Sequence, residues 1–164
     1  MADAALHLVI LAWLGTAAFL DIRFRRLPSW RWNLFSLLAA ALWAGLRGGW
    51  VAPAAVLWAV LLPRPWYFLA LSLLGLPEAQ PIPIMAGAAF RAAWERGWLG
   101  GADACAALAL LLVFPDPLML ALLSIALAVE AWVFRRQGER RFPGLAGLLG
   151  AALIRAMMWA AGLT

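Results

Sequence analysis

The chain alternates between apolar segments and short polar segments that hold its arginines, prolines and glycines. Several apolar segments approach the length that an α-helix needs to cross a bilayer, about 17–25 residues. We therefore predict helices at these segments. They are Ala4–Leu20, Trp32–Leu46, Ala104–Phe114, Leu118–Phe134 and Gly144–Gly162, with one or more further helices in residues 51–93.

Two interpretations fit residues 51–93. Pro63-Arg64-Pro65 interrupts this stretch, and prolines flanking an arginine are unfavourable in the middle of a membrane helix. In one interpretation Val51–Leu62 is a span, and Trp66–Leu76 and Ile84–Ala93 form a hairpin after it. In the other, a single kinked span is followed by a proline-rich loop. The pattern leaves both open.

The composition strengthens the membrane interpretation. Hydrophobic residues make up 66% of the 164 residues and charged residues 13%, whereas soluble domains average about 45–50% and about 25%. A chain this short cannot hide so much apolar surface in its own core. We expect one membrane-embedded domain over 1–164: an all-α integral membrane protein with about six transmembrane helices, whose surrounding partner is the lipid bilayer.

All thirteen basic residues are arginine, and most of them gather between the apolar segments. The densest groups lie in residues 23–31 and 135–141. Arginine-rich loops mark the cytoplasmic side of a membrane protein. This predicts a multi-pass protein of the cytoplasmic (inner) membrane with both termini outside. The same placement accounts for the net charge of +5 without a nucleic-acid partner.

Asp21 and Asp103 are the candidate catalytic residues. Each lies at the edge of an apolar segment, and both interpretations of residues 51–93 put them on the same membrane face. Carboxylates at such depth are costly and usually functional. Two adjacent carboxyls can share one proton, so that one deprotonates a water while the other polarises a peptide carbonyl. The pair therefore indicates an aspartic protease.

Residues for other catalytic chemistries are scarce. The chain has one cysteine, Cys105, and one histidine, His7. An intramolecular disulfide and a multi-cysteine zinc site are thereby excluded, and we predict neither a metal nor a cofactor. A structural explanation of the acids also stays open: Asp21 would pair with a nearby arginine, and Asp103 would cap the helix that follows it.

The first aspartate lies in a motif with a family likeness. The run Asp21-Ile22-Arg23-Phe24-Arg25-Arg26-Leu27-Pro28-Ser29 resembles the first motif of the prepilin peptidases (type IV leader peptidases, intramembrane aspartyl proteases of the GxGD type). That motif has Asp-x-Arg, a basic stretch and Ile-Pro-Asn directly after a membrane helix. Here Leu27 replaces the isoleucine and Ser29 the asparagine.

The second aspartate ends a run that resembles the family's Gly-x-Gly-Asp motif. The run is Gly100-Gly101-Ala102-Asp103. Gly100 matches the first glycine, whereas Ala102 departs from the second. Two residues after the aspartate the family usually has lysine, and this chain has Cys105.

The resemblance implies an aspartic endopeptidase that removes leader peptides from type IV prepilin-like protein precursors at the cytoplasmic membrane face. It implies Asp21 and Asp103 as catalytic residues and no cofactor. The backbone of Gly100, Gly101 and Ala102 would line the substrate groove as a loop. The cysteine-rich segment of larger, methylating members has no counterpart here, so peptidase activity alone is expected.

Two other classes stay open on the same residues. Intramembrane acids and arginines also suit a small polytopic transporter or channel, which would favour an internal repeat or paired broken helices. A catalytically inactive membrane subunit of a pilus or secretion assembly is the other class. The departures at Ala102 and Cys105 leave that alternative open.

Overall fold

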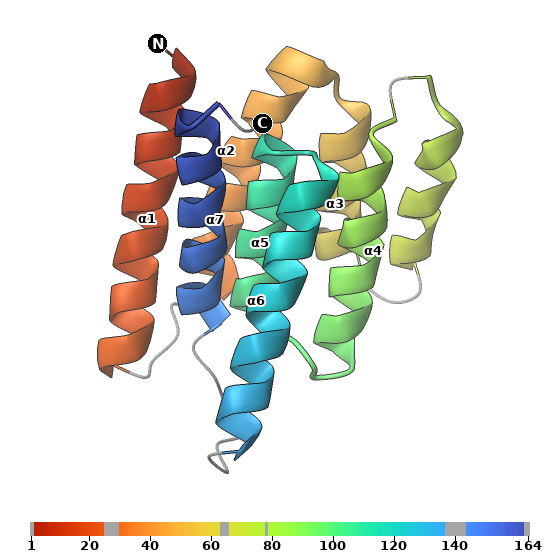
Figure 1. Cartoon of the computed structure of the whole chain (residues 1–164). Coiled ribbons are helices and arrows are strands. Elements are labelled where there is room, and N and C mark those ends of the chain that lie inside the picture. Colours follow the sequence, from red (N-terminus) through yellow and green to blue (C-terminus); the bar gives the residue numbers. More distant parts are fainter. Residues whose placement is uncertain (1, 25–29, 63–65, 78, 137–143, 163–164) are drawn as a thin grey trace. The chain divides into compact units, whose positions relative to one another are not determined.

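The computed structural model describes residues 2–24, 30–62, 66–77, 79–136 and 144–162. Every regular element within these ranges is helical (Figure 1). The elements are α1 (Ala2–Phe24), α2 (Trp30–Gly48), α3 (Val51–Leu61), the 3₁₀ helix η1 (Trp66–Gly75), α4 (Pro81–Glu95), α5 (Gly101–Val113), α6 (Pro117–Arg136) and α7 (Gly144–Ala160). The all-α prediction is confirmed for this part of the chain.

The chain divides into two compact units. The terminal unit combines Met1–Pro28 with Ala121–Thr164, and the central unit is Ser29–Leu120. Helices α1 and α7 pack together in the terminal unit, while α2, α3, η1, α4 and α5 pack together in the central unit. Helix α6 begins in the central unit and ends in the terminal one.

The structure rules out one of the two interpretations of residues 51–93. Helices α3, η1 and α4 are three separate elements, so the single kinked span is wrong. Pro81 is the first residue of α4, a position that suits proline because the first helical N–H has no intrahelical acceptor. The predicted break at Pro63-Arg64-Pro65 lies outside the described residues.

The prediction of about six transmembrane helices is wrong. Within the described ranges, no helix combines the length and the apolar character that a bilayer crossing requires. Helix α5 shows the physical reason. It has only 13 residues, and every residue from Ala102 to Leu112 is buried inside the protein. Apolar sequence alone does not distinguish a helix buried by its neighbours from a helix that faces lipid.

Small side chains let the helices of the central unit approach closely. Between α3, η1 and α4 the core is made mostly of alanine: Ala52, Ala55, Ala59, Ala70, Ile84 and Ala88. Such residues fill little volume, so the helix backbones lie near one another and gain dispersion contacts. Helix α5 packs chiefly on α2, and it also contacts α3 and α4.

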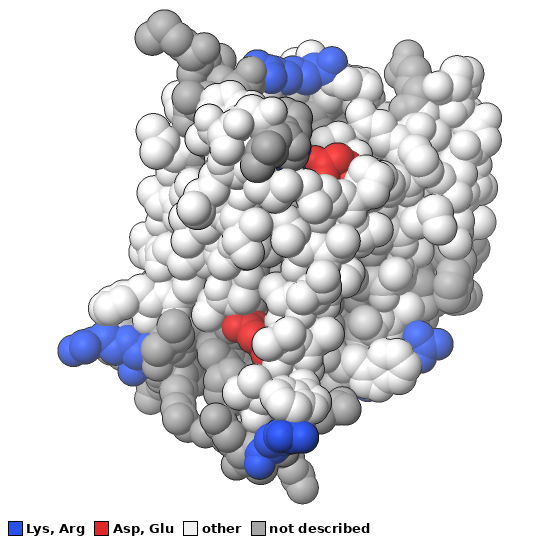
Figure 2. Space-filling model, viewed as in Figure 1, with Lys and Arg blue, Asp and Glu red and all other residues white. Residues whose placement is uncertain are grey.

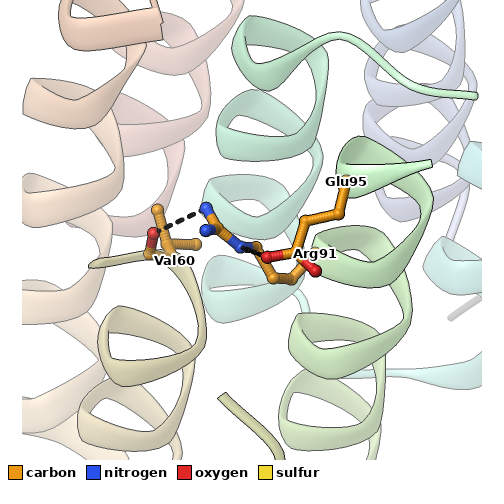
Figure 3. Close-up of polar contacts among 3 residues, drawn as sticks. All are labelled: Val60, Arg91 and Glu95. Atoms are coloured by element: carbon orange, nitrogen blue, oxygen red, sulfur yellow. Dashed lines mark hydrogen bonds and ion pairs between the residues drawn. The ribbon is translucent and has the colours of Figure 1, made fainter. Parts of the chain in front are cut away.

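Arg91 joins α4 to the end of α3 (Figure 3). Its Nη1 donates a hydrogen bond to the carbonyl of Val60 at 3.1 Å, and its Nε donates to Oε1 of Glu95 at 3.1 Å. Carbonyls in the last turn of a helix lack intrahelical donors. The guanidinium supplies one, and its Cζ also lies 4.6 Å from the ring centre of Trp94.

In the terminal unit, Glu130 of α6 contacts the start of α7. Its Oε1 accepts a hydrogen bond from the Gly147 amide at 2.7 Å. A Cβ at Gly147 would lie 2.7 Å from the carboxyl carbon of Glu130, closer than real side chains approach. Glycine is therefore what allows a carboxylate to reach the positive end of this helix.

Among the described residues on the visible face, charged side chains are few and most atoms belong to uncharged residues (Figure 2). Large apolar side chains are exposed on both units, for example Leu8 and Met157 on the terminal unit and Phe35 and Leu46 on the central unit.

We expect Gly147→Ala to lower the free energy of unfolding by about 1–2 kcal/mol, because the Glu130 carboxyl must withdraw and lose a charge-assisted hydrogen bond. Gly150→Ala is the matched control on the same helix. No atom lies within 4 Å of a Cβ there, so alanine should stabilise by about 0.5–1 kcal/mol. Chemical unfolding measures both, and equal effects would contradict the contact.

Candidate functional site

Asp103 lies in the first turn of α5 with its side chain buried. It is 3% exposed, and the N-cap of the helix is Gly100, three residues earlier. The alternative in which Asp103 is the N-cap residue of α5 is therefore wrong, because Gly100 occupies that position. The backbone amides at a helix start carry partial positive charge, which stabilises an anionic group in this turn.

Gly100 makes room for the carboxyl. A Cβ at Gly100 would lie 2.7 Å from Oδ2 of Asp103, so any larger residue would displace the acid. The conformation of Gly100 is not the reason for glycine, because its φ is −71°. The requirement is close approach between this backbone and the carboxyl group.

Gly101 makes room for an aromatic ring. A Cβ at Gly101 would lie 2.5 Å from the indole of Trp94, which comes from α4. The two adjacent glycines thus serve two different contacts. The predicted substrate loop is shorter than expected, because Gly101, Ala102 and Asp103 already belong to the helix.

Ala102 connects this turn to α2. Its side chain is 4% exposed, and its carbonyl accepts a hydrogen bond from Nδ2 of Asn33 at 3.0 Å. Because Ala102 is buried, Ala102→Leu would disturb the packing of α5 before it could narrow a groove. Whether Gly100, Gly101 and Ala102 contact a substrate stays a prediction.

Asn33 is the polar residue that the sequence analysis missed. It is fully buried on α2, and among the described residues its Oδ1 has no hydrogen-bond partner. A signal was present, because Asn33 is an amide near the start of the apolar segment Trp32–Leu46. Buried polar groups are usually hydrogen-bonded, so each exception points to a special role.

Asp21 belongs to the other unit. It lies near the end of α1, and its side chain is outside the described part of the structure. Arg23, two residues later, is exposed, with its guanidinium 6.0 Å from the Phe19 ring centre. The rest of the first motif, from Arg25 to Ser29, is also outside the described residues. The pairing of Asp21 with Asp103 therefore stays a prediction.

Cys105 is a buried free thiol one half-turn beyond Asp103. Burial raises the pKa of the Cys105 thiol to about 12, and the positive charge of Arg91 opposes that rise. A thiol with such a pKa is protonated at neutral pH and is a poor nucleophile. Within the described ranges, no three His, Cys, Asp or Glu side chains gather as metal ligands.

Comparison of the chain with protein-family models, with curated proteins and with solved structures gave no match. The chemistry of the site therefore has to be argued from its own residues.

We expect Gly101→Ala to destabilise the protein by about 1–3 kcal/mol, because the Trp94 indole must move out of a packed position. Gly87→Ala on α4 is the control. A Cβ at Gly87 would lie 3.6 Å from atoms of Val56 and Ala59, which is an ordinary contact. Gly87→Ala should therefore stabilise the folded protein by about 0.5–1 kcal/mol. If Gly101→Ala were neutral in chemical unfolding, the Trp94 contact would not hold this turn.

The Cys105 thiol should make stability fall at alkaline pH. The ordinary pKa of a cysteine thiol is 9.0, and burial raises that of Cys105 to about 12. Above pH 9.0 an unfolded chain with the ordinary pKa loses a proton that the folded state keeps. The free energy of unfolding then decreases by up to about 1.4 kcal/mol per pH unit. Cys105→Ala should remove this component. The prediction is wrong if the free energy of unfolding falls with pH at the same rate in wild type and Cys105→Ala between about pH 9 and about pH 10.

Proposed function

We propose that the protein is an aspartic endopeptidase of the prepilin-peptidase type, with Asp103 and Asp21 as its catalytic acids. One observation carries the proposal: a buried carboxyl in the first turn of α5, lodged against a glycine that leaves space for it. The resemblance of the two aspartate motifs supplies the choice of reaction.

The reaction needs one ionised and one protonated acid. The ionised carboxylate takes a proton from water as the water oxygen attacks the carbonyl carbon of the scissile peptide. The protonated acid donates a hydrogen bond to the carbonyl oxygen, where negative charge develops. Collapse of the tetrahedral intermediate breaks the C–N bond, and the proton taken from water passes to the leaving amine. Two carboxyls at one site reach this mixed state readily because like charges in proximity cannot both ionise.

The proposed substrate is a prepilin-like precursor, cut at the cytoplasmic membrane face. We propose contact with the lipid bilayer because large apolar side chains are exposed and arginines lie over aromatic rings at helix ends. Arg47 is 3.9 Å from the Trp43 ring centre and Arg136 is 4.0 Å from that of Trp132. Such pairs suit an interface that is apolar on one side and anionic on the other.

A non-catalytic subunit of a pilus or secretion assembly is the second candidate. The burial of Asp103 favours it, because a substrate must reach the acid. Cys105 favours it too, since it stands where the related motif has lysine. This candidate predicts a stable protein that binds prepilin-like chains without cutting them.

Asp103→Asn and Asp21→Asn should each abolish leader cleavage, because an amide can neither deprotonate water nor share a proton with the other acid. The measurement is cleavage of a candidate prepilin by protein of equal abundance. Asp116→Asn is the matched control. Oδ1 of Asp116 accepts a hydrogen bond from the Met119 amide at 2.7 Å, a capping role that asparagine also fills, so cleavage should persist.

The outcomes separate the candidates. Cleavage that survives either catalytic substitution would remove the aspartic-protease proposal. Binding of the precursor without cleavage by the wild type would favour the non-catalytic subunit.

A further inference from the structure

We propose that Asn33 is a positioning residue for Asp103: its side-chain amide holds the first turn of α5 in the orientation that the acid needs. The reactive part of this inference rests on the proposed function. The structural part concerns the central unit alone and can be tested without cleavage.

The hydrogen bond acts on the peptide group next to the acid. Nδ2 of Asn33 donates to the Ala102 carbonyl at 3.0 Å, and that carbonyl belongs to the peptide plane that ends at the Asp103 nitrogen. Rotation of this plane would carry the Asp103 side chain with it. Asn33 comes from α2, the main packing partner of α5, so the restraint is anchored in a separate helix.

The folded backbone does not require this hydrogen bond. In an α-helix each carbonyl accepts from the N–H four residues later, so the Ala102 carbonyl has a helical donor without Asn33. The Asn33 side chain is 0% exposed, and its Oδ1 has no hydrogen-bond partner among the described residues. Burying an unsatisfied acceptor is unfavourable, and an apolar side chain of similar size would avoid that cost. A role in stability alone therefore explains Asn33 poorly.

The same turn is fixed on another side by Trp94. Its indole occupies the space beside Gly101, and Arg91 lies over its ring. The turn that carries Asp103 is thus held by a polar contact from α2 and an aromatic contact from α4. Of the two, only the Asn33 contact comes from a buried amide.

The experiment compares Asn33→Leu with Asn33→Ala. Both remove the donor, but their effects on stability should differ, because leucine fills the volume and alanine leaves a cavity. Ser36→Ala is the matched control: Ser36 is also on α2, and its Oγ donates to the main-chain carbonyl of Asn33 at 2.7 Å rather than to α5. The readouts are the unfolding midpoint, kcat and KM for leader cleavage, and the labelling rate of Cys105, the one cysteine in the chain.

We expect both Asn33 variants to lose at least about tenfold in kcat, since a misplaced catalytic group can cost about 10²-fold, with KM little changed. Asn33→Leu should unfold no more easily than wild type. Native-state labelling of Cys105 should be several-fold faster in both variants, because the first turn of α5 opens more often. Ser36→Ala should leave kcat and labelling near the wild-type values.

Two results would overturn the inference. In the first, kcat changes only as stability changes, so that Asn33→Leu is active and Asn33→Ala is impaired. Asn33 would then be a packing residue. In the other, Cys105 labelling is unchanged in both variants. If the wild-type protein cleaves no precursor, the proposed function fails by itself, and Cys105 labelling alone decides whether Asn33 restrains the turn.

Discussion

The burial of α5 on all sides is the constraint on which the central unit depends. A helix enclosed by α2, α3 and α4 can approach its neighbours only where side chains are small, and its first turns are made of glycine, alanine, one aspartate and one cysteine. The same enclosure places any polar group of this helix in an apolar interior. There each unmet hydrogen bond is costly, so the buried polar groups of α5 and its neighbours need a reason beyond packing.

Among the described residues, Asp103 and Asn33 are the buried polar side chains of this region. Their positions are coupled, because the asparagine binds the carbonyl one peptide group away from the acid. Replacing both by apolar residues would suit a purely structural core. The proposed function accounts for their presence together, because reactive sites commonly give up stability for chemistry.

The positive charge near the first turn of α5 comes from Arg91 of α4, whereas the related motif would place a lysine on α5 itself. The related motif carries lysine two residues after its aspartate, where this chain has the buried Cys105. Arg91 of α4 is close enough for its charge to oppose the rise in the pKa of the Cys105 thiol. Its hydrogen bonds to Val60 and Glu95 hold the guanidinium beside the turn rather than within it.

The local pattern of apolar and polar residues indicated where helices form and which two aspartates are candidate catalytic residues. Apolar runs bounded by proline, glycine and arginine predicted the helices outside residues 51–93, where two interpretations stayed open. Asp103 was recognisable as an acid beside an apolar run. These features depend on neighbours along the chain, so local sequence carries them. The sequence also showed two glycines before Asp103, although it did not reveal that each accommodates a different group.

Only the tertiary structure decided what surrounds those elements. The apolar residues of α5 face other helices, and the pattern that suggested a membrane span could not show this. The hydrogen bond from Asn33 and the indole of Trp94 come from helices distant in the sequence. Which residues meet across helices depends on how the helices pack, and a one-dimensional hydrophobic pattern gives the face of a helix but not its partner.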